Sequence, residues 1–262
     1  MTKIISLANQ KGGVGKTTSS AHMARAARVK GLKVLAVDAD PQGNLTTAIA
    51  GRPMGSGEVG LADVLSAQSD ETLSDVIVPS VWEGVDLVPT TGDALSLVDQ
   101  ELVIMRAGRE SKLKDALATV KGEYDLILID CPPAVNQLTI NAWAASDSVV
   151  IVSHAALWSL DGIAHLLGNI REVGTYYNSG LSVAGVLINK FDKRKNSAQA
   201  RKRELISAAE EEGLNVFQPV IPDRVVISES AENGEALDLI RDEDAQRFAE
   251  IYAKYVTIVT ED

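Results

Sequence analysis

The sequence has very little cysteine, few histidines and no long apolar run. Cys131 is the only cysteine among 262 residues, so no disulfide can form within the chain, and a reducing cytoplasm suits it. The three histidines are isolated and lack the spacing of metal ligands. No apolar run approaches the roughly 20 residues that a membrane-spanning helix needs, and we expect no signal peptide. These absences exclude a disulfide-rich scaffold and a histidine-based metal site.

Positive charge is also in deficit, because 25 Lys and Arg face 36 Asp and Glu, for a net charge of −11. Such a protein is repelled by phosphate backbones, so nucleic-acid binding would require a local basic patch. One segment qualifies, with Asp192 as its one acid and with these cations: Lys190, Lys193, Arg194, Lys195, Arg201, Lys202 and Arg203. Two interpretations stay open: a solvated helix start neutralised by Glu204, Glu210 and Glu211, or a surface that contacts phosphates.

Short apolar runs alternate with helix-like segments, which is typical of a parallel sheet built from βαβ units. The runs are nearly continuous in Val, Ile and Leu, as expected where helices cover both faces of the sheet. We predict strands at residues 3–8, 33–37, 85–88, 125–129, 148–152 and 181–188. We predict helices at residues 18–30, 111–120, 157–177, 197–212 and 243–256. The glycine-rich stretch 51–60 predicts a mobile loop.

A glycine-rich turn joins the first predicted strand to the first predicted helix. This arrangement directs backbone N–H groups and the positive helix end at an anion, which indicates a triphosphate site. Lys16 would reach the β and γ phosphates, and the Thr17 hydroxyl would bind Mg²⁺. Gln10 stands where the ordinary loop has a glycine, and a second lysine heads the loop. The expected nucleotide contacts are Lys11, Gly12, Gly13, Val14, Gly15, Lys16, Thr17 and Thr18.

Three aspartates end two other predicted strands. Asp38 and Asp40 follow the strand predicted at residues 33–37, and Asp130 directly follows the strand predicted at residues 125–129. Since ligands of open parallel sheets bind at the carboxyl ends of strands, these motifs should converge on one site. Asp130 stands where an acidic residue holds Mg²⁺, and Asp40 could orient the attacking water. Alternatively, Asp38 or Asp40 caps a helix or turn.

The predicted fold class is α/β: a single P-loop domain over residues 1–262, with a mostly parallel twisted sheet covered by helices on both faces.

Residues 11–18, 38–44 and 130–133 resemble the deviant Walker A, A′ and Walker B motifs of the ParA/MinD family of P-loop ATPases. The resemblance runs from about residue 1 to 255, and residues 9–10 and 41–44 resemble the chromosome and plasmid partition branch. It implies ATP and Mg²⁺ as cofactors. It also implies a sandwich homodimer in which Lys11 reaches the phosphates of the partner's nucleotide. Lys11, Lys16 and Asp40 are then the catalytic residues, and Thr17, Asp38 and Asp130 lie at the metal.

The base side of the site is less specific. Residues 189–192 have the Asn-Lys-x-Asp form of the guanine-reading motif of GTPases, so GTP remains an alternative. The family resemblance places a base-contacting residue at Asn189 and implies adenine. It places a second base contact at Pro222 and Asp223. Asp223 stands where many members of the family have an arginine.

The resemblance implies an ATP-dependent DNA partition ATPase, cytoplasmic and nucleoid-associated, whose hydrolysis is stimulated by a ParB-type partner. Non-specific DNA would contact Lys193, Arg194, Lys195, Arg201, Lys202, Arg203 and Arg224. The chain starts at its first strand, so we expect no helix-turn-helix domain. The acidic tip at residues 257–262 predicts no membrane targeting.

Three other functions are compatible with parts of the sequence. The first is a ParA-like ATPase that positions a protein cargo with little DNA binding, which the net charge of −11 favours. The second is an ATP-dependent amide or lactam synthase. The third is a nitrogenase-iron-protein-like electron carrier, which a single cysteine argues against, because those relatives use two per subunit.

Overall fold

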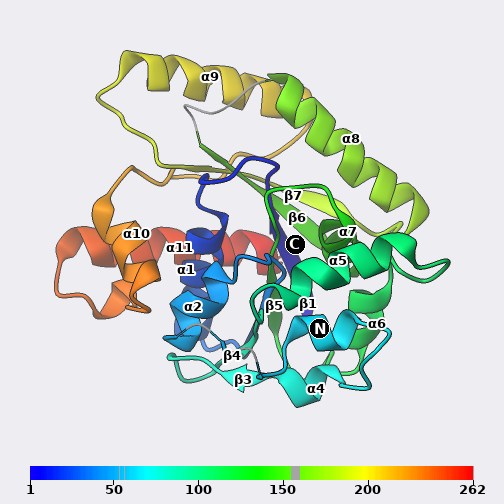
Figure 1. Ribbon diagram of the computed structural model, residues 1–262. Helices are drawn as coiled ribbons and strands as arrows, with labels where there is room; N and C mark the ends of the chain where they lie inside the picture. The colour runs from blue at the N-terminus through cyan, green and yellow to red at the C-terminus, as the bar shows by residue number, and fades with distance from the viewer. Residues whose placement is uncertain (53, 56, 155–159, 262) are drawn as a thin grey trace.

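Strand β1 (Lys3–Ala8) lies inside the sheet, between β5 (Leu126–Asp130) and β6 (Ser148–His154). The structure is a computed structural model that describes residues 1–52, 54–55, 57–154 and 160–261 (Figure 1). Within these ranges one seven-stranded sheet runs in the order β3-β4-β2-β5-β1-β6-β7. Its other strands are β2 (Val34–Asp38), β3 (Val78–Pro79), β4 (Val85–Val88) and β7 (Ser182–Asn189). Neighbouring strands are parallel except for β3 against β4, which confirms the predicted mostly parallel sheet.

Helices cover both faces of the sheet. Successive residues of each strand point to opposite faces, so both faces carry side chains that pack against helices. In β1, Ile4 belongs to one apolar cluster and Ile5 to the other. The first face carries α3 (Leu61–Leu65), α4 (Leu73–Val76), α5 (Ala94–Ile104), α6 (Lys112–Ala118), α7 (Gln137–Ala145), α8 (Leu160–Tyr176) and α9 (Asn196–Glu211). The second carries α1 (Lys16–Val29), α2 (Asn44–Ala50), α10 (Val225–Glu232), the 3₁₀ turn η1 (Leu237–Leu239) and α11 (Glu243–Glu261).

The predicted strands and helices are found with ends shifted by a few residues, but strand β3 and helices α2, α3, α4, α5, α7 and α10 were not predicted. Helix α5 exposes Leu97, Val103 and Ile104, so its sequence lacks a clean apolar stripe. Helix α10 opens with three β-branched residues, which favour strands. The first residues of the predicted helix 157–177 lie outside the described ranges. In the predicted loop 51–60, the described residues form neither helix nor strand. No helix in the described parts of the chain is long and apolar enough to cross a membrane.

Candidate functional site: a phosphate loop at the carboxyl edge of the sheet

The glycine-rich loop between β1 and α1 forms the predicted anion cradle. Gly13 and Gly15 have φ angles of 72° and 92°, a left-handed conformation that glycine adopts without strain. At Gly15 a Cβ would lie 2.0 Å from the Asn189 side-chain nitrogen, so no larger residue fits. Within the described chain, the backbone N–H groups of residues 12–15 donate to no protein acceptor. These unpaired donors stand before the N-terminus of α1, where an anion would satisfy them.

The two lysines of the loop have different surroundings. Lys16 is buried and lines a cavity of about 510 Å³, and its Nζ donates to the Lys11 carbonyl at 3.4 Å. The residue Lys11 is exposed at the head of the loop, and its backbone N–H donates to Asn9 Oδ1 at 2.9 Å. The side chain predicted to serve the chain's own nucleotide therefore points inward, whereas the one predicted to serve a partner lies at the surface.

The predicted metal side is built around Asp130. This carboxylate accepts from the Thr17 hydroxyl at 2.7 Å and the Ser20 hydroxyl at 2.9 Å, so the structure brings Thr17 and Asp130 together. Burial raises the pKa of Asp130 to about 6, against the two hydroxyl donors, which lower it. In the described part of the chain, no group of three His, Cys, Asp or Glu residues could hold a metal ion. A cation here would therefore need oxygens from the nucleotide beside the Thr17 hydroxyl.

Asp38 lies directly beside Asp130 in the register of β2 and β5, but its oxygens face α2. One oxygen accepts from the Thr46 backbone N–H and hydroxyl, each at 2.7 Å. The other accepts from the Asp40 N–H at 3.2 Å. Burial, followed by the repulsion of Asp130, raises the pKa of Asp38 to about 8. Neither Asp38 nor Asp130 lines the cavity, so the place of Asp38 near the metal stays a prediction, and its hydrogen bonds to Thr46 also hold the start of α2.

Asp40 does line the cavity, together with Lys16. Its carboxylate is almost buried and accepts from the Gln42 N–H at 3.0 Å. Burial raises the pKa of Asp40, whereas the nearby Lys16 ammonium lowers it. A carboxylate inside the cavity can accept hydrogen bonds from a water molecule, as the predicted role in orienting water requires.

The predicted base-side residues also come together. Thr18, Asn189, Pro222 and Asp223 line a small recess beside the loop, with Arg224 at its edge. The Asn189 amide donates to the Val14 carbonyl at 3.2 Å and accepts from the next backbone N–H at 2.8 Å. Base contact by Asn189 stays a prediction.

The described residues that line this recess do not include Asp192, the acidic residue that would read guanine. Both oxygens of Asp192 accept from the Arg194 guanidinium, at 2.9 and 3.1 Å, and Asp192 does not line the recess. A guanine base would need that carboxylate for its N–H groups. The geometry therefore favours adenine.

The phosphate cavity is also lined by residues that the sequence did not predict there: Lys190, Thr47 and Ala48 of α2, and two residues of α10. Lys190 was counted with the basic segment, yet its Nζ donates to the Gly13 carbonyl at 3.0 Å and it lines the cavity. The Asn-Lys pair in residues 189–192 is the signal that could have placed it there. Ala231 and Glu232, at the end of α10, also line the cavity, and no motif marks them.

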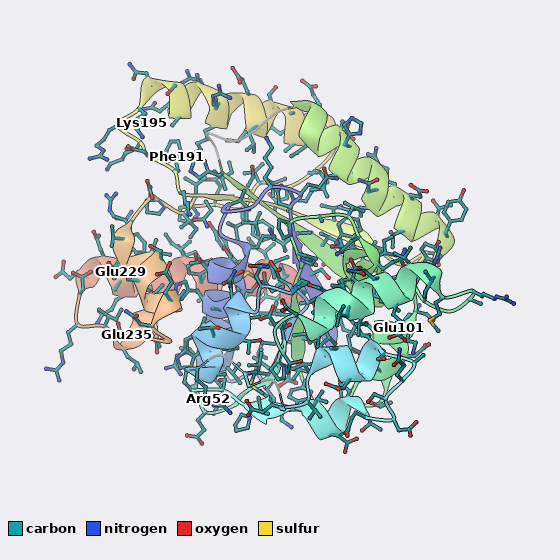
Figure 2. The ribbon with its side chains drawn as sticks, viewed as in Figure 1. Arg52, Glu101, Phe191, Lys195, Glu229 and Glu235 are labelled. Carbon is teal, nitrogen blue, oxygen red and sulfur yellow. The ribbon has the colours of Figure 1, made fainter. Side chains whose placement is uncertain are left out.

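The remaining basic residues of the segment lie just before α9 or in its first half, exposed apart from the half-buried Lys202. Figure 2 shows Lys195 at the start of α9. Arg194 and Lys195 both pair with Asp192, and Lys202 lies over the Phe191 ring at 5.2 Å. Across the described chain, Arg201 and the other predicted contacts on α9 form no ion pair with the glutamates proposed to neutralise them.

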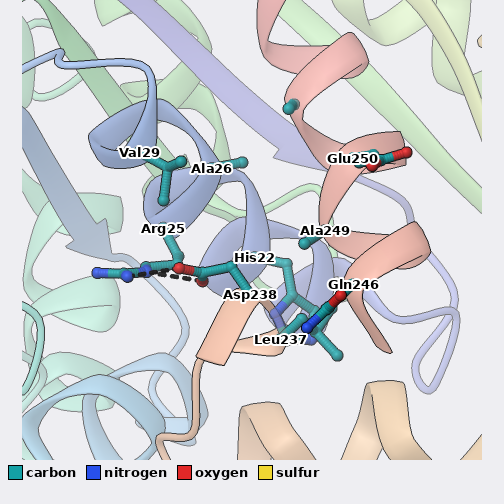
Figure 3. Close-up of a pocket in the computed structure, with 10 residues that line it drawn as sticks. His22, Arg25, Ala26, Val29, Leu237, Asp238, Gln246, Ala249 and Glu250 are labelled. Atoms are coloured by element: carbon teal, nitrogen blue, oxygen red, sulfur yellow. Dashed lines mark hydrogen bonds and ion pairs between the residues drawn. The ribbon is translucent and has the colours of Figure 1, made fainter. Parts of the chain in front are cut away.

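A second cavity, of about 250 Å³, lies between α1, η1 and α11, away from the phosphate loop (Figure 3). An ion pair between Arg25 and Asp238 crosses its edge at 2.6 Å. His22 reaches it from α1, and burial lowers the pKa of His22 to about 4. None of the predicted nucleotide contacts lines this cavity.

Known proteins resemble the chain over its whole length. A family model described as an AAA domain matches residues 2–183. The sporulation initiation inhibitor protein Soj of Bacillus subtilis is 38% identical over 253 residues, 96% of each chain. The chain belongs to the ParA/MinD family of P-loop ATPases. Chromosome partitioning protein ParA of Caulobacter vibrioides is 35% identical over 88% of this chain and 85% of its own.

A solved structure extends the comparison. Cobyrinic acid a,c-diamide synthase from Mycobacterium smegmatis, with bound ADP and magnesium, superimposes with a TM-score of 0.79. It is 32% identical, over 98% of this chain and 93% of its own. Relatives thus include both a chromosome partitioning protein and a biosynthetic enzyme.

Proposed function

We propose that this ParA/MinD-family ATPase is a partition ATPase that binds Mg-ATP, forms a sandwich homodimer on it and then binds non-specific DNA. Hydrolysis, weak in the isolated protein and stimulated by a ParB-type partner, would separate the dimer and release the DNA. The observation that carries the proposal is the contrast between Lys11 and Lys16, since one ammonium is buried in the cavity and the other residue is exposed. Relatives named Soj and ParA support it.

The chain's own residues have separable tasks in this scheme. The unpaired N–H groups of residues 12–15 and the Lys16 ammonium bind the phosphates. Thr17 and Asp130 would hold Mg²⁺, which would neutralise phosphate charge. Asp40 orients the attacking water.

Dimerisation would make DNA binding depend on ATP. One subunit presents a small basic surface against a net charge of −11, whereas a dimer presents two. Since affinity rises steeply with the number of phosphates contacted, doubling the surface converts weak binding into strong binding. The absence of an acidic residue from the first turn of α9 leaves the positive helix end uncompensated, which also favours phosphate.

DNA binding with ATP, with ADP and without nucleotide tests this proposal. We expect retention with ATP alone, and a weaker salt dependence for the double variant Arg201→Ala, Arg203→Ala. Four cations per dimer would be lost, so the slope of log K against log salt should fall by about 3 to 4. Lys114→Ala with Lys121→Ala is the charge-matched control on the distant helix α6 and the turn after it. Equal binding in all three nucleotide states would contradict the proposal.

The second candidate is an ATPase that positions a protein cargo and binds little DNA. One observation favours it: three of the basic residues are already engaged, Lys190 with the loop and Arg194 and Lys195 with Asp192. Under this alternative, ATP still drives dimerisation, but DNA is not retained at low salt.

A synthase remains the third candidate because of the resemblance to cobyrinic acid a,c-diamide synthase. Steady ATP turnover that is raised by a small carboxylic acid, and unaffected by DNA, would favour it.

A further inference from the structure

The end of strand β7 is tied to the phosphate loop by two side chains. Asn189 donates to the Val14 carbonyl at 3.2 Å, and Lys190 donates through Nζ to the Gly13 carbonyl at 3.0 Å. Strand β7 is separated from β1 by β6, so these contacts reach across the sheet edge. Two consecutive carbonyls of the loop are therefore held toward the same pair of residues.

These carbonyls control where the loop directs its donors. In a trans peptide the C=O and the following N–H point in opposite directions. Holding the carbonyls of Gly13 and Val14 toward β7 therefore turns the N–H groups of Val14 and Gly15 to the other side. Both N–H groups donate to no acceptor in the described chain. An anion cradle requires this arrangement, with N–H groups directed at the anion and carbonyls kept away from it.

Lys190 adopts an unfavourable backbone conformation to make its contact. Among the described residues it is the one non-glycine residue with a positive φ, at 51°. This left-handed conformation is strained for a residue with a Cβ, and such strain is concentrated at functional positions. The side chain then lines the phosphate cavity beside Gly12, Gly13 and Lys16. Of the three N–H donors of its ammonium, one is used by the Gly13 carbonyl.

We propose that Lys190 is a positioning residue of the phosphate loop, which holds the Gly13 carbonyl turned away from bound phosphates. Lys190 thereby sets the affinity for nucleoside diphosphates and triphosphates alike. This role rests on the nucleotide binding proposed above. It assigns Lys190 to the nucleotide site, although its position in the sequence places it among the cations of the basic segment.

Three variants test the role. Lys190→Met removes the donor and keeps the length of the side chain, Lys190→Arg restores a donor, and Lys114→Met is a control on α6. The affinities for Mg-ADP and Mg-ATP are measured by calorimetry. Hydrogen exchange of the amides in residues 9–18 is measured on the nucleotide-free protein, where it reports the loop alone.

We expect Lys190→Met to weaken both nucleotides roughly tenfold, because one charge-assisted hydrogen bond is lost. We also expect faster exchange of the loop amides without nucleotide. The KM for ATP should rise while kcat at saturation stays unchanged, and Lys190→Arg should recover most of each effect. The Lys114→Met protein should match the wild type.

Several outcomes would overturn the inference. Unchanged affinity and unchanged exchange in Lys190→Met would remove the role altogether. Weaker binding with unchanged exchange would assign Lys190 to direct phosphate contact instead. Weaker binding of ATP but not of ADP would place its effect at the γ phosphate. A wild type that binds no nucleotide would contradict the proposed function, while the exchange measurement would still decide whether Lys190 shapes the loop.

Discussion

Gly15 and Gly12 look equivalent in the sequence, but the structure predicts opposite consequences for their replacement by alanine. At Gly15 the added Cβ would lie 2.0 Å from the Asn189 nitrogen, more than 1 Å closer than real contacts, and φ is +92°. At Gly12 no described atom lies within 4 Å of the added Cβ, and φ is outside the left-handed region. One substitution should therefore distort the loop, and the other should be tolerated.

The cost at Gly15 has two parts. A left-handed residue with a Cβ costs about 1 to 2 kcal/mol, and displacement of Asn189 breaks its hydrogen bond to Val14, which contributes about 1 kcal/mol. The sum of about 2 to 3 kcal/mol corresponds to a loss of nucleotide affinity on the order of 100-fold if the loop, rather than the fold, gives way.

Calorimetric titration with Mg-ADP measures the affinity, and urea unfolding without nucleotide shows how much of the cost appears in stability. We expect Gly15→Ala to bind Mg-ADP on the order of 100-fold more weakly than the wild type, and Gly12→Ala to bind within about threefold of it. Binding by Gly15→Ala within threefold of the wild type would refute the argument from the Asn189 contact. An equal loss in both variants would show that the loop needs glycine for another reason.

Three further predictions follow from single residues. Lys11→Ala should bind Mg-ATP yet stay monomeric; a dimer with ATP in light scattering would contradict the role of Lys11. Asp130→Asn should lose the Mg²⁺ dependence of ATP binding, because it removes the charge beside Thr17; an unchanged Mg²⁺ titration would argue against that site. Because the pKa of His22 falls from 6.5 to about 4 on folding, stability should be fully present above pH 6.5 and decline toward pH 4. His22→Gln should remove about 2 kcal/mol of that decline between pH 7 and 4.5, as urea unfolding at both pH values would show.

The central strands and the phosphate loop were predictable because their signals are local. The continuous apolar run of residues 126–129 is followed directly by Asp130, and the glycines of the loop stand between a strand and a helix start. The parallel order of strands then places Asp130 beside the loop without further information. Thr17 was placed at the metal by the same reasoning, and it donates to Asp130.

Other parts of the site depend on contacts between residues that no local pattern connects. Lys190 and Gly13 are 177 positions apart, so the basic composition around Lys190 was the stronger signal. The hydrogen bonds from the hydroxyl and N–H of Thr46 to one Asp38 oxygen could not be foreseen from the sequence, whereas the place of Asp38 near the metal stays a prediction. Glu232 reaches the cavity from α10, whose β-branched start conceals a helix.

The central place of β1 affects the order in which a growing chain can fold. Lys3 pairs with Leu126 and Ile5 with Ser148, so strand β1 has neither of its neighbours in the sheet until about 120 further residues have been added. At about 5 to 20 residues per second, that interval lasts roughly 6 to 25 seconds on a ribosome. The loop contacts from the end of β7 arrive later still. A nascent chain therefore acquires its nucleotide site only after residue 190 has been added, and the apolar strand β1 must be shielded from aggregation until then.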